Sequence, residues 1–340
     1  MSADPILIWG AGAIGGVLGA YFQRAGHDVL LVDVAGDHVE AMNRDGLLIE
    51  GPVEEFRQSV RAALPAEVEG RFRRVILAVK AHHTPNALGM LVPHLADDGF
   101  VVSAQNGLNE SVIADTIGAS RTMGCFVNFG ADWQAPGRIL YGNRAAVALG
   151  ELDGRTTERL AEMHALFRLV EPDAVMTDNI WGYLWGKLGY GALLFATALT
   201  NDSMADALAR ERYFPVYDAL GREVMSLARA QDIQPLGFNG FDPAAFSNGS
   251  VSEAARRSVA AMTEHNRHTA KTHSGIWRDL AVRKRRTEVD AQVLPLTAIG
   301  AEHGVPTPAL ARLVALVHDL EAGRREQSLQ TLDEMLSACA

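Results

Sequence analysis

The sequence predicts an α/β protein in which a doubly wound, mostly parallel sheet is followed by an all-helical domain. Two observations carry this prediction. In the first third of the 340-residue chain, short apolar runs alternate with helical patterns, which is typical of parallel strands joined by helices. From about Arg155 onward, apolar residues recur at helical spacing, and the pattern changes near 170–178. We therefore expect one domain at 1–175 and a second at 176–340.

Local patterns predict the individual elements. Apolar runs predict strands at 5–10, 28–32, 75–79, 100–103 and 122–127, and a helix ended by Gly26 is expected at 13–25. Alternation at 138–150 predicts antiparallel strands at the far edge of the same sheet. Further helices are expected at 155–169, 179–199, 205–230, 252–285, 289–303, 308–322 and 327–338, with a loop at 235–250.

Composition limits the partners of this chain. It carries 41 acidic and 31 basic side chains, a net charge of −10, so neither nucleic acid nor a membrane surface is expected as a partner. Two cysteines, Cys125 and Cys339, cannot form a disulfide framework and favour a cytoplasmic location.

No targeting or membrane segment is expected. The N-terminus lacks the basic region of a signal peptide. The apolar stretch at 180–199 contains Lys187 and several glycines, which indicates a buried helix rather than a membrane span.

A glycine-rich segment follows the first predicted strand and opens the first predicted helix. It consists of Gly10, Ala11, Gly12, Ala13, Ile14 and Gly15. We expect Gly10 to make a tight turn, Gly12 to let backbone approach a pyrophosphate, and Gly15 to let helix and strand pack closely. The helix N-terminus would offer N–H groups and a positive dipole end to the phosphates. Strand, glycine pattern, helix and second strand therefore predict a Rossmann domain that binds a dinucleotide.

Asp33, at the end of the second predicted strand, indicates which dinucleotide is bound. Its carboxylate is placed to accept hydrogen bonds from both adenosine ribose hydroxyls, whereas a 2′-phosphate would meet a like charge. The nearest arginine in the following segment, Arg44, is about three helical turns further on. NAD is therefore expected, and NADP is less favoured. The alternative is that Asp33 only caps the turn that follows it.

Six short motifs are spread in order along nearly the whole chain. They are GAGAIGG at 10–16, VK at 79–80, QNG at 105–107, WGKL at 185–188, RTEVD at 286–290 and GVPTP at 304–308. In this order they resemble the motifs of ketopantoate reductases, NAD(P)-dependent enzymes that reduce a 2-oxo acid to a 2-hydroxy acid. The resemblance implies a Rossmann domain, a helical domain resembling the C-terminal domain of 6-phosphogluconate dehydrogenase, and an active site in the cleft between them.

The resemblance also implies roles for four residues. Lys187 looks like the general acid that protonates the substrate carbonyl, and Glu288 like the acidic residue beside it. An ammonium in an apolar helix has its pKa lowered by desolvation, which agrees with that role. Lys80 and Asn106 resemble residues that line the cleft, where Asn106 would contact both cofactor and substrate. The alternatives are that Lys187 reaches the helix surface and that Glu288 is an ordinary surface charge beside the basic run 283–286.

On the predicted lysine helix the chain departs from the family. Positions where the family carries substrate-binding asparagines hold Gly191 and Phe195. Gly191 would open space and Phe195 would add an apolar wall, so ketopantoate itself is a doubtful substrate and a larger or more apolar compound fits better. Asn201, just past this helix, is a candidate to replace one missing amide.

A second departure lies where the family carries a pair of serines. Ser274 takes one serine position and remains a candidate donor to the substrate carboxylate. Lys271 and His273 lie beside it and are candidates for a polar, partly cationic rim. His265 and His268 are expected to share a helix face, which makes them candidate metal ligands as well. No second ligand cluster is evident in the sequence, so a metal is not expected.

Together these features predict an NAD-dependent oxidoreductase that interconverts a hydroxy compound and its ketone by hydride transfer. The hydroxy compound is expected to be a 2-hydroxy acid. One alternative is a 2-dehydropantoate 2-reductase that converts ketopantoate to pantoate with NADPH. Another is a non-catalytic dinucleotide-sensing protein. The resemblance and an apolar stripe at 309–320 suggest a homodimer, unless that stripe packs within its own domain.

Overall fold

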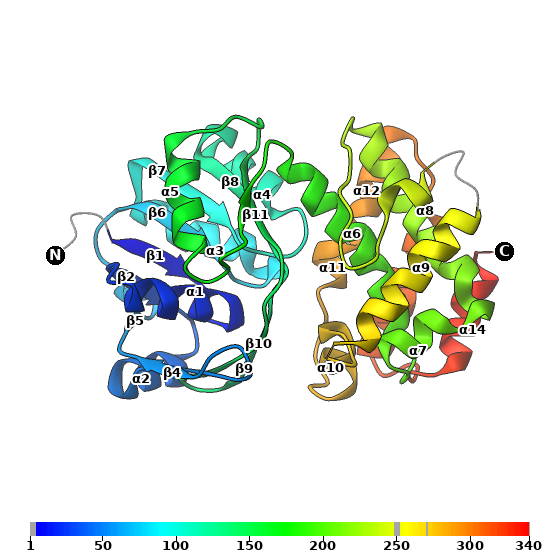
Figure 1. Cartoon of the computed structure of the whole chain (residues 1–340), viewed down its shortest axis with the longest axis horizontal. Coiled ribbons are helices and arrows are strands. Elements are labelled where there is room, and N and C mark those ends of the chain that lie inside the picture. The colour runs from blue at the N-terminus through cyan, green and yellow to red at the C-terminus, as the bar shows by residue number, and fades with distance from the viewer. Residues whose placement is uncertain (1–4, 248–251, 270, 340) are drawn as a thin grey trace. The chain divides into compact units, whose positions relative to one another are not determined.

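The computed structural model describes residues 5–247, 252–269 and 271–339. The chain forms two compact units, Met1–Ile180 and Trp181–Ala340, of which the first is α/β and the second is built of helices (Figure 1). The division falls at the start of helix α6 (Ile180–Thr197), slightly after the predicted boundary between 175 and 176. Residues 1–4, on which the signal-peptide prediction depends, lie outside the described residues. So do residues 248–250, the last three of the predicted loop at 235–250.

In the described part of the first unit, eight strands form the main sheet. They are β1 (Ile6–Trp9), β2 (Val29–Val32), β5 (Arg61–Ala63), β6 (Phe72–Leu77), β7 (Leu95–Ser103), β8 (Thr122–Val127), β11 (Val147–Glu151) and β12 (Val175–Met176). Their order is β12-β11-β8-β7-β6-β1-β2-β5, and β11 runs antiparallel to β8. After β5 the chain returns to the other side of β1. The carboxyl ends of β1 and β6 therefore form the switch point at which such sheets bind ligands.

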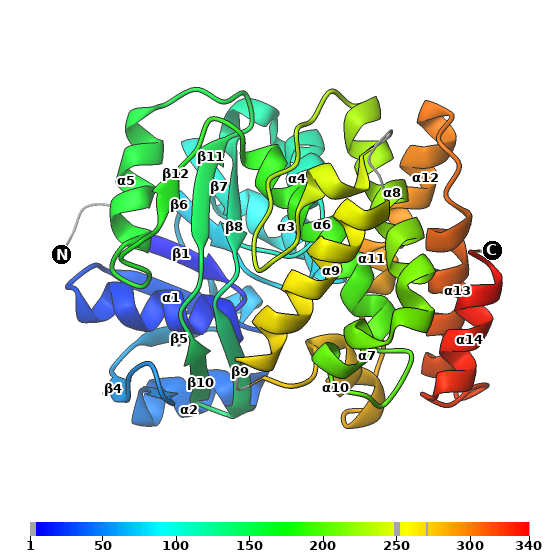
Figure 2. The ribbon, with the colours of Figure 1, turned by 45° about the vertical axis from the view of Figure 1, so that its right-hand side comes forward.

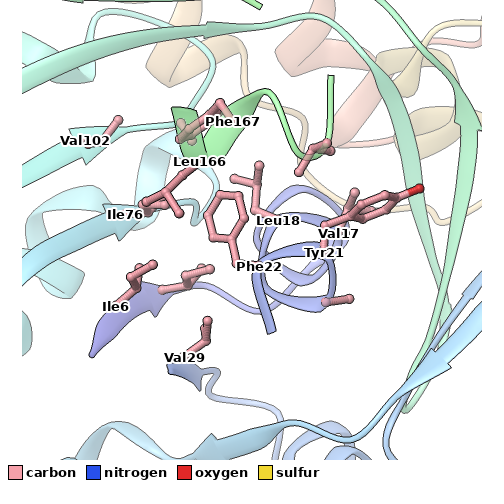
Figure 3. Packing of buried hydrophobic residues seen from close by; sticks show 14 of the residues in the cluster. Ile6, Val17, Leu18, Tyr21, Phe22, Val29, Ile76, Val102, Leu166 and Phe167 are labelled. Carbon is pink, nitrogen blue, oxygen red and sulfur yellow. The ribbon is translucent and has the colours of Figure 1, made fainter. Parts of the chain in front are cut away.

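Helices cover both faces of this sheet. On one face lie α1 (Ala13–Arg24) and α5 (Glu158–Phe167), and on the other α3 (Thr84–Leu91) and α4 (Asn109–Ile117). Alternate residues of β1 serve the two layers: Ile6 and Ile8 pack with α1 and α5, and Leu7 and Trp9 with α3 and α4. Figure 3 shows Phe22 of α1 inside the first of these cores. Burial on both faces explains why the predicted strands are continuously apolar.

A second, smaller sheet was only partly predicted. It is formed by β3 (Leu47–Glu50), β4 (Phe56–Gln58), β9 (Gly130–Ala135) and β10 (Arg138–Asn143), in the order β4-β3-β10-β9. The prediction that 138–150 lies entirely at the edge of the main sheet is therefore wrong for β10, whereas β11 does pair with β8. The alternating pattern predicts a strand but not its partner. The partner is decided by packing, because Ile139 is buried against α1 at Gly16.

The second unit contains α6 and, further along the chain, α7 (Met204–Ala209), α8 (Phe214–Ala230), α9 (Ser252–Arg267), α10 (Gly275–Ala281), α11 (Val289–Gln292), α12 (Leu294–His303), α13 (Pro308–Glu321) and α14 (Leu329–Ser337). The helices predicted at 205–230, 252–285 and 289–303 are each divided in two. Pro215 in the first turn of α8 disfavours a continuous helix from α7, and Ser274 caps a new helix at α10. Helical spacing alone does not reveal such breaks.

Helix α13 buries the apolar stripe at 309–320. Its buried residues are Ala309, Leu310, Leu313, Val314, Leu316 and Val317. The helix contacts α8, α12 and α14, and Figure 2 shows α13 and α14 side by side. The stripe packs within its own unit, as the alternative held, and so it gives no support for a homodimer.

Helix α6 is largely buried within the protein, as the lysine and glycines of this apolar stretch predict. A Cβ at Gly186 would overlap the carbonyl oxygen of Leu236, so this glycine permits close packing against the 235–237 segment. Among the residues that the structure describes, no helix is both long enough and apolar enough to cross a membrane.

A buried carboxylate of α8 gives a pH prediction. Glu223 accepts hydrogen bonds at 2.8 Å from the N–H groups of Ala309 and Leu310 and so caps α13, while burial raises its pKa above 4.5. The folded state then holds the proton more tightly than the unfolded state. This contribution to stability is fully present below pH 4.5 and is lost as pH rises through the folded pKa.

We expect the free energy of unfolding of the wild-type protein to fall, relative to that of Glu223→Gln, as pH rises from about 4.5 toward neutrality. Urea unfolding of both proteins at a series of pH values measures this difference. Two parallel pH curves would contradict the role given to Glu223.

Candidate active site

The glycine-rich loop connects β1 to α1 and touches the segment after β6. Gly10 has φ +102°, and a Cβ there would lie 2.7 Å from the backbone nitrogen of Val79. A Cβ at Gly15 would overlap the Gly10 carbonyl oxygen, so helix and loop are in close contact. At Gly12, by contrast, a Cβ would meet no atom of the described structure within 4 Å. The loop is therefore tight at both ends and open in the middle, where a phosphate can approach the backbone.

The N-terminus of α1 suits an anion. Within the described residues no side chain caps this end of the helix, and its first turn contains no acidic residue. The first N–H groups of such a helix need an outside acceptor, and its dipole favours a negative one. The loop and the helix end thus fit the pyrophosphate of a dinucleotide.

Asp33 directly follows β2 and is half-buried. Its Oδ1 accepts a hydrogen bond of 3.0 Å from the Ala35 N–H, so Asp33 does cap the turn that follows it. Oδ2 makes no hydrogen bond within the described part of the chain, so the carboxylate retains an acceptor for a ribose hydroxyl. Arg44 is engaged with Asp45 at 2.7 Å and with Glu40 at 3.5 Å.

Lys80 and Asn106 lie in the loops that follow β6 and β7. Lys80 is half-buried, Asn106 is exposed, and hydrogen bonds tie the two loops together. Gln105 donates to the hydroxyl of Thr84 at 2.8 Å, and that hydroxyl donates to Asn109 at 2.8 Å. Asn109 in turn donates to the carbonyl of Asn106 at 2.6 Å. Gln105 belongs to the QNG motif at 105–107, whereas Thr84 and Asn109 begin α3 and α4 and were not predicted to take part in the site.

Helix α6 places three of the predicted residues on one face. Lys187, Gly191 and Phe195 are four residues apart, so they follow one another along the helix. Lys187 is half-buried and Phe195 is fully buried. A Cβ at Gly191 would meet nothing within 4 Å in the described structure, whereas one at Gly189 would press on Phe241 and Met225. Space is therefore open beside Gly191 on the face that carries Lys187.

Glu288 precedes α11 and is half-buried. The residue before it is fixed firmly, because both the N–H and the hydroxyl of Thr287 donate to Glu321 Oε1 at 2.7 Å. In the basic run at 283–286, Arg285 donates a hydrogen bond of 2.8 Å to the buried Asp279 rather than to Glu288. Glu288 thus stands on a well-supported segment rather than at the end of a loose loop.

The structure brings Asn201, His273 and Ser274 together around Trp277. The sequence did not predict a role for this tryptophan. The His273 ring lies against the Trp277 ring at a tilt of 35°, with 4.0 Å between centroids, and the indole N–H donates to Asn201 Oδ1 at 3.3 Å. Asn201 also donates to the Gln327 carbonyl at 2.9 Å, so its amide is already used within the unit. Ser274 is buried, and its hydroxyl oxygen accepts from the backbone N–H of Trp277 at 3.1 Å, which caps α10.

The remaining candidates of this region do not form a cluster. His268 is exposed and lies just past the end of α9, with its Nε2 2.7 Å from Glu264 Oε1, so it does not share a helix face with His265. Burial lowers the pKa of His265. Lys271 is exposed. In the described ranges of the chain, no three His, Cys, Asp or Glu side chains are placed to hold a metal ion together.

A doubly wound sheet with an open glycine-rich loop defines a dinucleotide-binding unit. Together with the relatives reported below, it makes this protein an NAD(P)-dependent oxidoreductase acting on CH–OH groups. Two family models match the chain. The model described as ketopantoate reductase PanE/ApbA matches residues 6–154, and its C-terminal counterpart matches residues 179–321. The chain belongs to the ketopantoate reductase family.

Individual proteins agree with this assignment. The chain is 32% identical to a 2-dehydropantoate 2-reductase of Mesorhizobium japonicum, over 94% of this chain and 98% of the relative. A ketopantoate reductase family structure from Ralstonia eutropha superposes with a TM-score of 0.77 at 26% identity, covering 95% and 100% of the two chains. D-mandelate dehydrogenase, solved with NADH and anilino(oxo)acetate, shares the fold with a TM-score of 0.79 at 21% identity, covering 94% and 99%.

Proposed function

We propose that this protein interconverts a 2-hydroxy acid and its 2-oxo acid with NAD, and that its substrate is bulkier or more apolar near the reacting carbon than ketopantoate. The nicotinamide, when bound, donates hydride in reduction and accepts it in oxidation. Lys187 Nζ gives a proton to the substrate oxygen in reduction and takes it back in oxidation. Glu288 holds the lysine ammonium in position within the helical unit, and Lys80 and Asn106 of the first unit contact the bound dinucleotide.

The open space beside Gly191 carries the substrate proposal. Alanine stabilises a helix interior by about 0.5–1 kcal/mol relative to glycine. At Gly186 and Gly189 the lack of a Cβ is required by packing, but at Gly191 no described atom would oppose one. A glycine that packing does not require leaves room next to the proposed proton donor. We assign that room to the substrate's side chain. Phe195, further along the same face, is only 1% exposed and therefore lies beneath the surface rather than lining that room.

The cofactor preference rests on Asp33 and on the state of Arg44. A free carboxylate oxygen suits the ribose hydroxyls of NAD and opposes a 2′-phosphate. Arg44 is occupied by Asp45 and Glu40, so it is not poised to receive a phosphate. NAD is therefore proposed over NADP.

A second candidate is ketopantoate reduction with NADPH, favoured by the names of the curated relatives at 32% and 28% identity. Initial rates with ketopantoate, with a straight-chain 2-oxo acid and with a phenyl-substituted 2-oxo acid, each with NADH and NADPH, separate the two candidates. The proposal expects the highest kcat/KM with a bulky or aromatic 2-oxo acid and NADH. A clear preference for ketopantoate with NADPH would establish the second candidate instead.

The Gly191→Asn variant tests the space beside Lys187. The new amide narrows the space and adds a hydrogen-bonding group, so we expect the ratio of kcat/KM for ketopantoate to that for the phenyl-substituted acid to rise about tenfold or more. Gly191→Ala is the control for helix propensity, and it should raise stability without favouring ketopantoate as strongly. An unchanged ratio in Gly191→Asn would show that the substrate does not use this space.

A further inference from the structure

His38 lies on helix α2 (Gly36–Asp45), outside every site considered above, and its side chain is buried with 1% of its surface exposed. Both ring nitrogens are engaged. The Gly137 N–H donates to Nδ1 at 2.9 Å, so Nδ1 carries no proton. Nε2 lies 2.9 Å from the carbonyl oxygen of Ala11 and must therefore be the protonated nitrogen that donates to it.

This contact reaches the cofactor loop at an informative point. Ala11 is fully buried, and its N–H donates to the Val32 carbonyl at 3.0 Å. Its carbonyl is held by His38, so the Ala11 residue is tied on both sides. The peptide between Ala11 and Gly12 is planar and trans, which makes the Gly12 N–H point opposite to the Ala11 carbonyl. Fixing the carbonyl therefore fixes the direction of the Gly12 N–H at the open centre of the loop.

The small sheet in turn holds His38 in place. Gly137 lies in the turn between β9 and β10 with φ +70°, and its carbonyl accepts the Leu48 N–H of β3 at 2.9 Å. The edge of Trp133 on β9 packs near the imidazole, with 6.1 Å between ring centroids. The turn is thus anchored on one side to the small sheet and on the other to His38.

We propose that His38 is a positioning residue for the dinucleotide: it transmits the rigidity of the small sheet to the Ala11–Gly12 peptide and so holds the Gly12 N–H ready for the pyrophosphate. A loop that already has its bound conformation loses less conformational entropy when the dinucleotide binds. This proposal rests on the proposed dinucleotide binding but not on the identity of the 2-oxo acid. It is tested by the Kd for NADH, whereas the substrate proposal is tested by kcat/KM, so the failure of one can be told from the failure of the other.

Two amide variants separate this role from simple packing. In His38→Gln the amide N–H₂ can take the place of Nε2 and keep the bond to Ala11, while the bond to Gly137 is lost. In His38→Asn the shorter amide can take the place of Nδ1 and keep the bond to Gly137, while the bond to Ala11 is lost. Each variant loses one buried hydrogen bond, so urea unfolding should show similar losses of stability.

Their affinities for NADH, measured by fluorescence titration, should differ. We expect the Kd for NADH to rise about tenfold in His38→Asn and to stay near the wild-type value in His38→Gln. Equal Kd values in the two variants, or a larger rise in His38→Gln, would overturn the proposal.

A measurement on the unaltered protein does not depend on either variant folding. Coupling between two sites is reciprocal, so if the bond from His38 Nε2 supports NADH binding, NADH must also stabilise that bond. In protein labelled with ¹⁵N-histidine, saturation with NADH should slow the exchange of the His38 Nε2 proton with solvent. Exchange at the same rate with and without NADH would overturn the proposal.

Discussion

Lys187→Met lowers kcat for reduction of the preferred 2-oxo acid by about 10²–10⁴-fold, the usual contribution of a positioned general acid. Methionine keeps an unbranched side chain of similar length in α6, so packing should be largely retained, but it has no proton to give to the developing alkoxide. The Kd for NADH should stay near the wild-type value, because the dinucleotide contacts that we propose are made by residues of the first unit and Lys187 is assigned only to proton transfer. Steady-state rates and NADH titration measure the two quantities separately.

Lys284→Met provides a matched control, because Lys284 is an exposed lysine of the same unit. We expect that variant to keep wild-type turnover. Retained turnover in Lys187→Met would exclude Lys187 as the proton donor. A loss of NADH binding equal to the loss of activity would instead point to damage beyond the proton-transfer step.

Asp33→Arg reverses the cofactor preference. The substitution removes the carboxylate that we assign to the ribose hydroxyls and places a guanidinium where a 2′-phosphate would lie. Hydrogen bonds to charged groups contribute about 1.5–3 kcal/mol each, so the ratio of kcat/KM with NADH to that with NADPH should fall by about 10²-fold or more. The variant also loses the Asp33 bond to the Ala35 N–H, so part of the decrease with NADH will reflect a looser turn.

Glu69→Arg is the matched control for charge, since Glu69 is an exposed acid of the same unit and does not hold Arg44. It introduces the same change of charge, and we expect it to leave the cofactor ratio near the wild-type value. A similar fall in both variants would mean that the general potential of the unit, and not a contact at Asp33, sets the preference.

Much of the first unit could be predicted because its signals are local. The strand at 122–127 coincides with β8, and the helix predicted at 13–25 ends only one residue late. Strand β10 was assigned to the wrong sheet, since alternation specifies burial on one side and not the neighbouring strand. In the second unit, helices separated by short breaks were merged, because the apolar period continues across Pro215 and across the segment before Ser274.

The sequence by itself determined the α/β class, the order of the two units, the dinucleotide loop and the family, because each depends on short-range pattern or on motifs in a fixed order. Only the tertiary structure revealed that the small sheet reaches the loop through His38, because Ala11, His38 and Gly137 are far apart in the sequence and meet only after packing. The tertiary structure also showed that the glycines of α6 have different roles. Gly186 is required by a neighbouring backbone, whereas Gly191 faces open space, and that difference lies in what surrounds the helix rather than in its sequence.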